Sequence, residues 1–217
     1  MQTPLKVEIV SDVSCPWCVI GYQSLFTALE KLAPKIPAEL SWKPFELNPK
    51  MPVEGQDMGE HLHEKYGSSK ADIAQTKEMI TGRGKALNFE FNFKENGRIY
   101  NTFNAHRLLY WAMQFDKQTE LSLAFFGLYF TDGGSPGNVD QLLNAVQKLG
   151  LPVDEARKIL ESDQFAKEVR EEQAKYQAMG VKAVPTFIIN NKYKLTGGLP
   201  IEEFVTMLEK ILAEEAS

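Results

Sequence analysis

The feature that most constrains this chain is a pair of cysteines, Cys15 and Cys18, separated by Pro16 and Trp17. They are the two cysteines of a 217-residue chain. A disulfide between them would close a very short loop, so it would remove little entropy from the unfolded chain and add little stability. In a reducing compartment such a pair is more often catalytic or metal-binding than structural. The spacing therefore favours a chemical role for the two thiols.

The pair lies where a predicted strand is followed by a predicted helix. Leu5–Ser11 alternates β-branched and polar residues, as is typical of a strand. Pro16 suits a first helical turn, because its missing N–H would be unpaired there. The helix is expected to end near Ala33 and Pro34, since the residue before a proline resists helical geometry. Its buried face is predicted from apolar residues at helical spacing, namely Cys18, Tyr22, Leu25, Leu29 and Leu32.

This position predicts different roles for the two sulfurs. Cys15 is expected at the positive end of the helix, where free N–H groups stabilise a thiolate, the nucleophilic form. Cys18 is expected one turn further on the buried face, close enough to resolve a mixed disulfide formed by Cys15. Trp17 has no place on that apolar face and is expected to project toward the mouth of the site.

Half of a zinc site is an alternative for this spacing. A structural zinc site needs four ligands, almost always Cys or His. The chain offers no third cysteine, and its histidines are His61, His63 and His106. We therefore predict no metal. An inert pair of buried thiols is a second alternative, which a strand-to-helix junction disfavours because reactivity is tuned there.

The strand and helix pattern predicts an α/β fold. A second strand at residues 39–47 gives strand–helix–strand order, which implies parallel pairing through a right-handed crossover. Strands at 186–190 and 192–196 flank Asn190 and Asn191, residues that tolerate the positive φ of a tight hairpin. A closing helix is expected after them, with Pro200 at its first position.

The middle of the chain is predicted to be mostly helical. Helical periodicity covers residues 101–114, 120–130, 138–149 and 154–161, and a further helix runs from 162 to about Gly180. The predicted order is βαβ, a helical insertion, then αββα. We place one domain in residues 1–50 and 165–217, and a helical insertion domain in residues 51–164.

Val184 and Pro185 directly precede the predicted strand at 186–190. Proline avoids strand interiors because it lacks the ladder donor. If the bond between them were cis, the backbone of Val184 would turn away from the sheet and could pair with an extended substrate beside Cys15. About 5–6% of X–Pro bonds in folded proteins are cis, so the local sequence alone predicts trans.

Cys15-Pro16-Trp17-Cys18 after a strand, Val184-Pro185-Thr186-Phe187 before another, and a long helical insertion resemble the thioredoxin-fold DsbA family. Within it the chain is similar to the FrnE-like branch of oxidoreductases and polyketide-biosynthesis dithiol–disulfide isomerases. Further matches lie at Ser11-Asp12-Val13-Ser14, Phe45-Glu46-Leu47-Asn48-Pro49 and Asn101-Thr102-Phe103-Asn104-Ala105-His106-Arg107-Leu108. The likeness covers essentially the whole chain.

The resemblance implies a thioredoxin fold with a large α-helical insertion, as in DsbA, and a cysteine pair that cycles between dithiol and disulfide. It also implies a cis Val184–Pro185 bond facing that pair, with Pro16 and Trp17 at the mouth of the substrate site. The chain departs from the periplasmic members, which commonly carry histidine where Trp17 stands and have an export signal. Their strongly oxidising character is therefore not expected here.

The same branch resembles kappa-class glutathione transferases and hydroxychromene-carboxylate isomerases, which typically use a serine at the position of Cys15. A glutathione-dependent isomerase or transferase acting on a small aromatic substrate is thus the alternative function, and a non-catalytic binding module is a third. Asn48, Asn101 and His106 sit where such relatives line their substrate cleft. Asn101 could instead cap a helix, and a lone helical histidine is more often simply packed.

Composition narrows the partners and the location. With 43% hydrophobic and 24% charged residues the chain is globular, and its net charge of −5 argues against nucleic acid or an anionic membrane as partner. No run approaches the ~20 apolar residues of a membrane span. Lys6, Glu8 and Asp12 stand where a signal peptide needs an apolar block, so we expect a cytoplasmic protein. We expect a thiol or disulfide substrate, glutathione as a candidate co-substrate, no required cofactor, and a monomer or homodimer.

Overall fold

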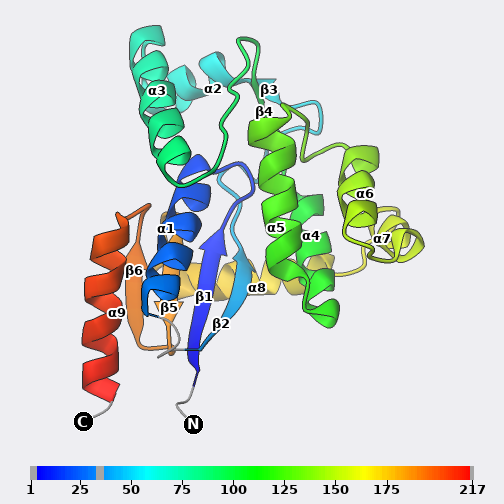
Figure 1. The fold of residues 1–217 in the computed structure, drawn as a ribbon. Coiled ribbons are helices and arrows are strands. Elements are labelled where there is room, and N and C mark those ends of the chain that lie inside the picture. The colour runs from blue at the N-terminus through cyan, green and yellow to red at the C-terminus, as the bar shows by residue number, and fades with distance from the viewer. Residues whose placement is uncertain (1–3, 33–36, 216–217) are drawn as a thin grey trace.

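The computed structural model describes residues 4–32 and 37–215. Its centre is a four-stranded sheet of order β2-β1-β5-β6, made of β1 (Leu5–Ser11), β2 (Ala38–Pro44), β5 (Thr186–Ile189) and β6 (Tyr193–Thr196) (Figure 1). β1 pairs parallel with β2 and antiparallel with β5, which pairs antiparallel with β6. Strands from the two ends of the chain thus meet in one sheet.

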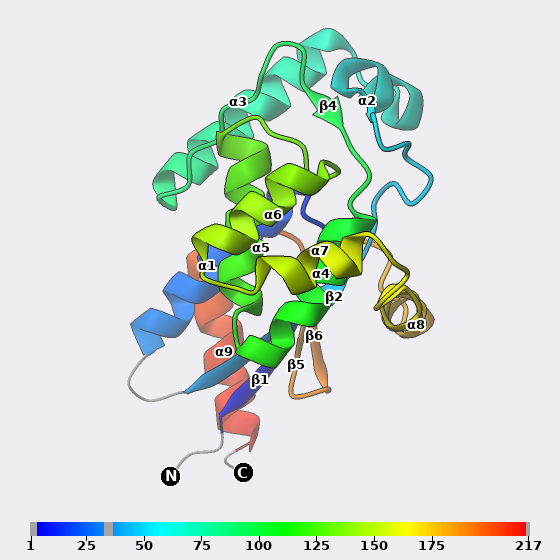
Figure 2. The same ribbon diagram turned by 90° about the vertical axis from the view of Figure 1, so that its right-hand side faces the viewer.

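Helices cover both faces of this sheet. α1 (Pro16–Leu32) and α9 (Ile201–Glu215) lie on one face, and α8 (Ala166–Ala178) lies on the other, as the two views together show (Figure 1, Figure 2). α1 approaches the sheet closely at Gly21, where an added Cβ would lie 2.8 Å from Cγ of Pro185. The predicted buried face of α1 is confirmed for its members Cys18, Tyr22, Leu25 and Leu29.

The segment between β2 and α8 is helical, as predicted, and lies beyond one end and one side of the sheet (Figure 1). Its elements are β3 (Gln56–Asp57), α2 (Met58–Tyr66), α3 (Lys70–Ala86), β4 (Arg98–Ile99), α4 (Phe103–Ala112), α5 (Gln118–Phe126), α6 (Val139–Lys148) and α7 (Val153–Leu160). The order βαβ, helical insertion, αββα is confirmed. The domain division at residues 50 and 165 stays a prediction. In the part of the chain that is described, no helix combines the length and the apolar character needed to cross a membrane.

Some predicted boundaries are wrong. The strand predicted at 39–47 ends at Pro44, because its partner β1 ends at Ser11. The N–H of Leu47 instead donates to the carboxylate of Asp12. The helix predicted at 120–130 gives way after α5 to a π-helical turn, Gly127–Thr131, and the helix predicted at 101–114 is the shorter α4 followed by a 3-10 turn. The predicted end of the first helix near Ala33 and Pro34 lies outside the described residues.

The C-terminal hairpin follows its prediction. Asn190 and Asn191 connect β5 to β6 with φ values of 50° and 55°. Asparagine tolerates this left-handed region better than most residues. The turn therefore brings β6 back along β5 in the register that pairs Thr186 with Thr196.

Candidate active site

The start of α1 and the segment before β5 bring Cys15, Cys18 and Val184 together. Cys15 directly precedes α1, Cys18 lies in its first turn, and Val184 lies shortly before β5. The thiol of Cys15 donates to the carbonyl oxygen of Val184, with 3.6 Å between Sγ and O. The Val184–Pro185 bond is cis, as the resemblance implies and against the prediction from local sequence. Both cysteines are free thiols in this structure.

The two thiols differ in access and in proton affinity. Cys15 is 3% exposed and borders a cavity, whereas Cys18 is 0% exposed. Burial raises the pKa of the Cys18 thiol well above its ordinary value, and the neighbouring Cys15 raises that pKa further. The side chain of Ser11 and the backbone of Asp12 oppose this shift without outweighing it. Cys18 therefore keeps its proton at neutral pH.

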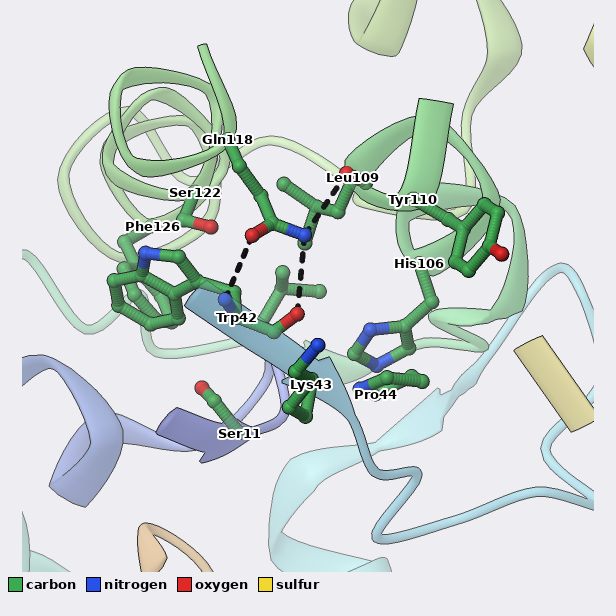
Figure 3. A pocket seen from close by; sticks show the side chains of 11 residues that line it. Ser11, Trp42, Lys43, Pro44, His106, Leu109, Tyr110, Gln118, Ser122 and Phe126 are labelled. Carbon is green, nitrogen blue, oxygen red and sulfur yellow. Dashed lines mark hydrogen bonds between the residues drawn. The ribbon is translucent and has the colours of Figure 1, made fainter. Parts of the chain in front are cut away.

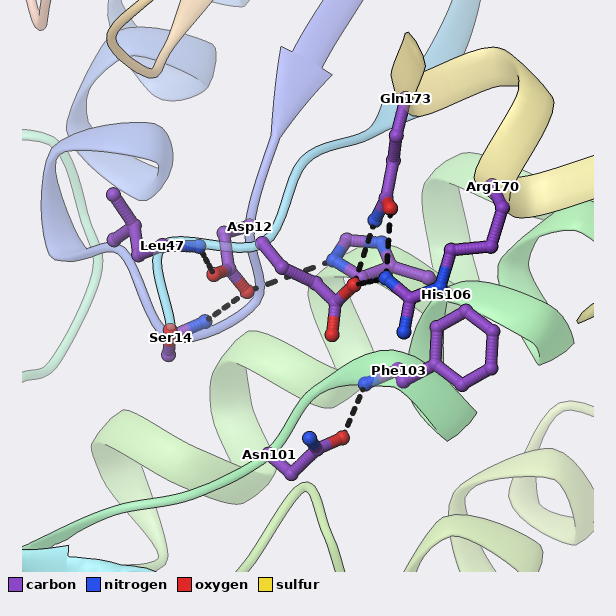
Figure 4. Close-up of polar contacts among 9 residues, drawn as sticks. Asp12, Ser14, Leu47, Asn101, Phe103, His106, Arg170 and Gln173 are labelled. Carbon is purple, nitrogen blue, oxygen red and sulfur yellow. Dashed lines mark hydrogen bonds and ion pairs between the residues drawn. The ribbon is translucent and has the colours of Figure 1, made fainter. Parts of the chain in front are cut away.

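Asp12 holds the loop that leads to Cys15. It is 1% exposed, and its Oδ1 accepts from the N–H of Ser14 at 3.2 Å while Oδ2 accepts from the N–H of Leu47 at 2.7 Å (Figure 4). Nε2 of His106 lies 3.6 Å from Oδ1. Burial raises the pKa of Asp12, but His106 and the two backbone N–H groups lower it by more, so its pKa lies below the ordinary value. This ionised carboxylate connects the cysteine loop, the segment after β2, and α4.

His106 is placed beside Asp12 and does not border the cavity of Cys15. It is 3% exposed on α4 and faces a separate hollow of about 10 Å³ near Lys43 and Pro44 (Figure 3). Space of that size holds about one water molecule. The contact of His106 that bears on the cysteine site is therefore the one with Asp12.

The two asparagines lie in different surroundings. Asn101 donates from Nδ2 to the carbonyl of Met51 at 3.0 Å, and its Oδ1 accepts from the N–H of Phe103 at 2.9 Å, at the start of α4 (Figure 4). Asn48 borders the cavity of Cys15 and accepts from Nζ of Lys65 at 2.7 Å. The structure thus brings Asn48, and not Asn101, to the cysteine pair.

The cavity beside Cys15 has a volume of about 460 Å³. Volumes of about 300–1,000 Å³ are typical of small-molecule sites. Pro16, Trp17 and Val184 border it next to Cys15, whereas the predicted site residue Pro185 is buried and does not. The opposite side, here called the α2–α3 wall, is mainly apolar and includes Met58, Leu62, Ile73, Ile80, Phe93, Ile99, Tyr129 and Phe130. Sequence reasoning missed this wall.

His61 of α2 also borders the cavity, and sequence reasoning considered it as a zinc ligand alone. Nε2 of Gln56 donates to Glu64 at 2.8 Å, so Oε1 of Gln56 accepts from Nδ1–H of His61 at 2.9 Å. Burial lowers the pKa of His61 and Lys65 lowers it further, while Glu64 opposes the shift. The ring is therefore neutral at pH 7, with Nε2 as a hydrogen-bond acceptor.

Metal ligands are not gathered in this region. Within residues 4–32 and 37–215, no three or more His, Cys, Asp or Glu side chains are grouped to hold a metal ion. Among the described residues, the zinc alternative for Cys15 and Cys18 therefore lacks a ligand set. A zinc site closed by four Cys or His ligands would need two more beside the pair.

Comparison with known proteins places this arrangement in a family. A family model described as a DSBA-like thioredoxin domain matches residues 6–209. The structure is similar to that of a probable DsbA oxidoreductase from Streptomyces coelicolor, with a TM-score of 0.91 and 27% identity over 97% of this chain and 91% of that chain. The uncharacterized protein YwbO of Bacillus subtilis is 26% identical over 189 residues, which are 86% of this chain and 88% of its own.

A more distant structure shows the same fold. The cytosolic disulfide reductase DsbM from Pseudomonas aeruginosa, solved with GSH, has a TM-score of 0.63 and 14% identity over 96% of this chain and 99% of that chain. The predicted α/β thioredoxin fold with a large helical insertion is confirmed, and the FrnE-like branch is consistent with these matches. The chain belongs to the DsbA-like thioredoxin domain family.

Proposed function

We propose that the protein catalyses thiol–disulfide exchange, with Cys15 as the attacking thiolate and Cys18 as the resolving thiol. The observation that carries the proposal is the asymmetry of the pair. Cys15 borders the cavity at the N-terminal end of α1, where a helix favours negative charge, whereas Cys18 is fully buried one turn away. Thiol–disulfide oxidoreductase is also the enzyme class of the family to which the chain belongs.

The proposed cycle has two exchange steps. The Cys15 thiolate attacks a disulfide R–S–S–R′, forming a Cys15–S–S–R mixed disulfide and releasing R′–S⁻. The sulfur of Cys18 then attacks that of Cys15, and its proton passes to the departing R–S group. Two electrons move from the protein to the substrate, leaving a Cys15–Cys18 disulfide. Because the raised pKa of Cys18 keeps it protonated beforehand, it does not compete for the first attack. The reverse sequence oxidises a dithiol.

The residues around Cys15 are proposed to bind the substrate. Pro16, Trp17 and Asn48 border the cavity and shape its mouth. The backbone of Val184, held by the following Pro185, lies beside Cys15 where an extended substrate would pass.

Asn101 and His106 are proposed to act indirectly. The side chain of Asn101 bonds to backbone at the start of α4, and His106 contacts Asp12. Both contacts position the segments that meet at Asp12, so we propose that these two residues hold the site in place without touching the substrate.

Reduction of insulin in the presence of a small dithiol tests the proposal. We expect Cys15→Ser to fall to the rate of a variant lacking both cysteines, which serves as the control. Cys18→Ser retains the first attack, so a mixed disulfide at Cys15 should accumulate and be visible by intact mass. Undiminished turnover in Cys15→Ser would remove Cys15 from the mechanism.

A glutathione-dependent isomerase or transferase acting on a small aromatic substrate is the second candidate. The observation that favours it is the cavity of about 460 Å³, which suits a small molecule more than a protein chain. The DsbM structure solved with GSH supports glutathione as a candidate co-substrate. Turnover of such a substrate that depends on glutathione and survives Cys18→Ser would favour this function over disulfide exchange.

We propose a thiol- or disulfide-bearing substrate for either function. The cytoplasmic location and the choice between monomer and homodimer stay predictions. Size-exclusion chromatography with light scattering on the reduced protein would decide the oligomeric state, and a tagged copy expressed in its own cell would decide the location.

A further inference from the structure

The cavity beside Cys15 carries positive charge without a matching negative charge. Lys65 on α2, Lys77 on α3 and Lys182 before Val184 border it, and among the described residues no Asp or Glu does. Over the whole chain, acidic residues outnumber Lys and Arg by 29 to 24. The cavity therefore has the opposite sign to the protein as a whole.

The contacts described for Lys65 and Lys77 are with uncharged groups. Nζ of Lys65 donates to the carbonyl of Leu47 at 2.9 Å and to Asn48 at 2.7 Å, both uncharged acceptors. Nζ of Lys77 lies 5.8 Å from the centroid of the Phe93 ring. Within the described residues, no ion pair includes any of the three lysines. Their field therefore acts on whatever enters the cavity.

The rest of the cavity favours an apolar body. The α2–α3 wall presents aliphatic side chains together with the rings of Phe93, Tyr129 and Phe130. The hydroxyl of Tyr129 is already bonded to the carbonyl of Arg98 at 2.7 Å, so its ring is what remains for a ligand. A ligand that covers this apolar lining removes it from water, and this burial favours binding. The lysines and the apolar wall together fit a ligand in which an anionic group is attached to an apolar body.

We propose that this cavity selects a small-molecule disulfide, or its thiol, that joins an anionic group to an apolar or aromatic body. The proposal rests on thiol–disulfide exchange at Cys15 and adds the class of substrate. The body lies against the α2–α3 wall, the anionic group lies near Lys77 and Lys182, and the sulfur reaches Cys15. The exchange oxidises the cysteine pair to its disulfide and reduces the substrate to two thiols. A small thiol reductant returns the pair to the dithiol.

Two aromatic disulfides, one anionic and one neutral, compare the effect of charge. Dithiobis(nitrobenzoate) carries a carboxylate on each ring, and dithiodipyridine is uncharged. The second-order rate constants for oxidation of the reduced protein by each probe give an anionic-to-neutral ratio. The same ratio is measured for free mercaptoethanol. Dividing the protein's ratio by it corrects for the different intrinsic reactivities of the two probes. We expect a normalised ratio above one that declines as ionic strength rises, because salt screens the lysines.

The double variant Lys77→Gln/Lys182→Gln tests the source of the preference. Lys65 is left unchanged because it also bonds Leu47 and Asn48. We expect the normalised ratio to fall about three- to tenfold, the size typical of removing two partly exposed charges near a binding site. The double variant Lys148→Gln/Lys158→Gln, on the helices α6 and α7, removes the same number of charges at residues that do not border the cavity, and it serves as the matched control.

The outcomes separate this inference from the function on which it rests. If both probes oxidise the pair but the normalised ratio is one, or the double variant leaves it unchanged, the anionic substrate class is wrong and disulfide exchange stands. If neither probe forms the Cys15–Cys18 disulfide, the proposed function fails and the substrate class fails with it. A ratio that falls equally in Lys148→Gln/Lys158→Gln would assign the preference to net charge and overturn the role of the cavity.

Discussion

The two sides of the cavity beside Cys15 are built differently. On the cysteine side, Cys18 and Asp12 are almost fully buried, and Asp12 bonds two backbone N–H groups. On the opposite side, every residue of α2 is at least partly exposed, and α3 buries Ile80 and Gly84. The reacting sulfurs therefore lie on a densely packed frame, whereas the helices α2 and α3, which carry one part of the wall, bury few residues.

This contrast separates chemistry from selectivity. Segments with few buried apolar contacts open at lower free energy than the core of a domain, and binding regions are often drawn from them. We expect the helices α2 and α3 to adjust to the substrate while the frame around Cys15 stays fixed. The following predictions test that difference, beginning with the largest effect.

The frame should make Cys18 unreactive. In a Cys15→Ser variant, we expect iodoacetamide to alkylate Cys18 at pH 7 at least about a hundredfold more slowly than a small free thiol, because burial excludes the reagent and the raised pKa leaves little thiolate. Mass spectrometry over time gives the rate. Cys15 in Cys18→Ser is the matched control and should react faster, since it borders the cavity. Equal rates would contradict the asymmetry on which the mechanism depends.

Asp12→Asn should destabilise the protein by about 2–4 kcal/mol, because charge-assisted hydrogen bonds to Ser14 and Leu47 are weakened in a buried site. The pKa of Asp12 is lowered by folding, so its stabilisation is present above about pH 4, the ordinary value in the unfolded chain, and is lost as pH falls through the lower folded-state value. Urea unfolding at several pH values measures both effects.

The variant should lose this part of the acid dependence, and an unchanged pH profile would show that Asp12 is not the group responsible. Asp72→Asn is the control on the wall. Asp72 also has a lowered pKa, through hydrogen bonds with Ser69, but it lies in solvent, where water replaces those bonds. Its substitution should therefore cost much less than that of Asp12.

Gly21→Ala should destabilise the protein by about 1–3 kcal/mol, the usual cost of overpacking a core. The added Cβ would lie 2.8 Å from Pro185 and 3.0 Å from the ring of Phe187, so α1 must shift away from the sheet. Because α1 carries the cysteines, thiol–disulfide exchange should slow as well. Urea unfolding and the insulin assay check the two parts, and full stability in this variant would mean that α1 is not tightly packed on β5.

Gly82→Ala is the counterpart on helix α3 and has the smallest expected effect. Gly82 lies within α3, and nothing lies within 4 Å of the position of an added Cβ. Alanine in a helix interior is more stable than glycine by about 0.5–1 kcal/mol, so we expect a gain of that size. Destabilisation by Gly82→Ala would show that the wall is packed as tightly as the frame.

The cysteine side of the site could be predicted because its signals are local. Four consecutive residues after Leu5–Ser11, followed by apolar residues at helical spacing, place Cys15 and Cys18 without reference to distant residues. The family resemblance implied the cis Val184–Pro185 bond, whereas the low frequency of cis X–Pro bonds predicted trans. The C-terminal hairpin was predictable for the same reason, since Asn190 and Asn191 tolerate the positive φ that the turn requires.

The rest of the site could not be predicted because its signals are weak or lie far apart in the sequence. α2 and α3 bury few residues, so they lack the apolar stripe by which a helix facing a core is found. Asp12 belongs to a segment that matches the family, but its contacts with Leu47 and His106 depend on how β2 and α4 pack against the cysteine loop. The predicted role of Asn101 and His106 in substrate binding stays a prediction, since neither residue borders the cavity of Cys15.

By itself the sequence determined the elements of the sheet, the position of the two thiols at the start of a helix, and their separation by one turn. Each of these follows from interactions among residues close together in the chain. Tertiary structure alone decided that Val184 lies beside Cys15, that Asp12 accepts from the backbone of Leu47, and that three lysines border a mainly apolar cavity. These depend on contacts between distant segments, which packing selects and short-range patterns do not record.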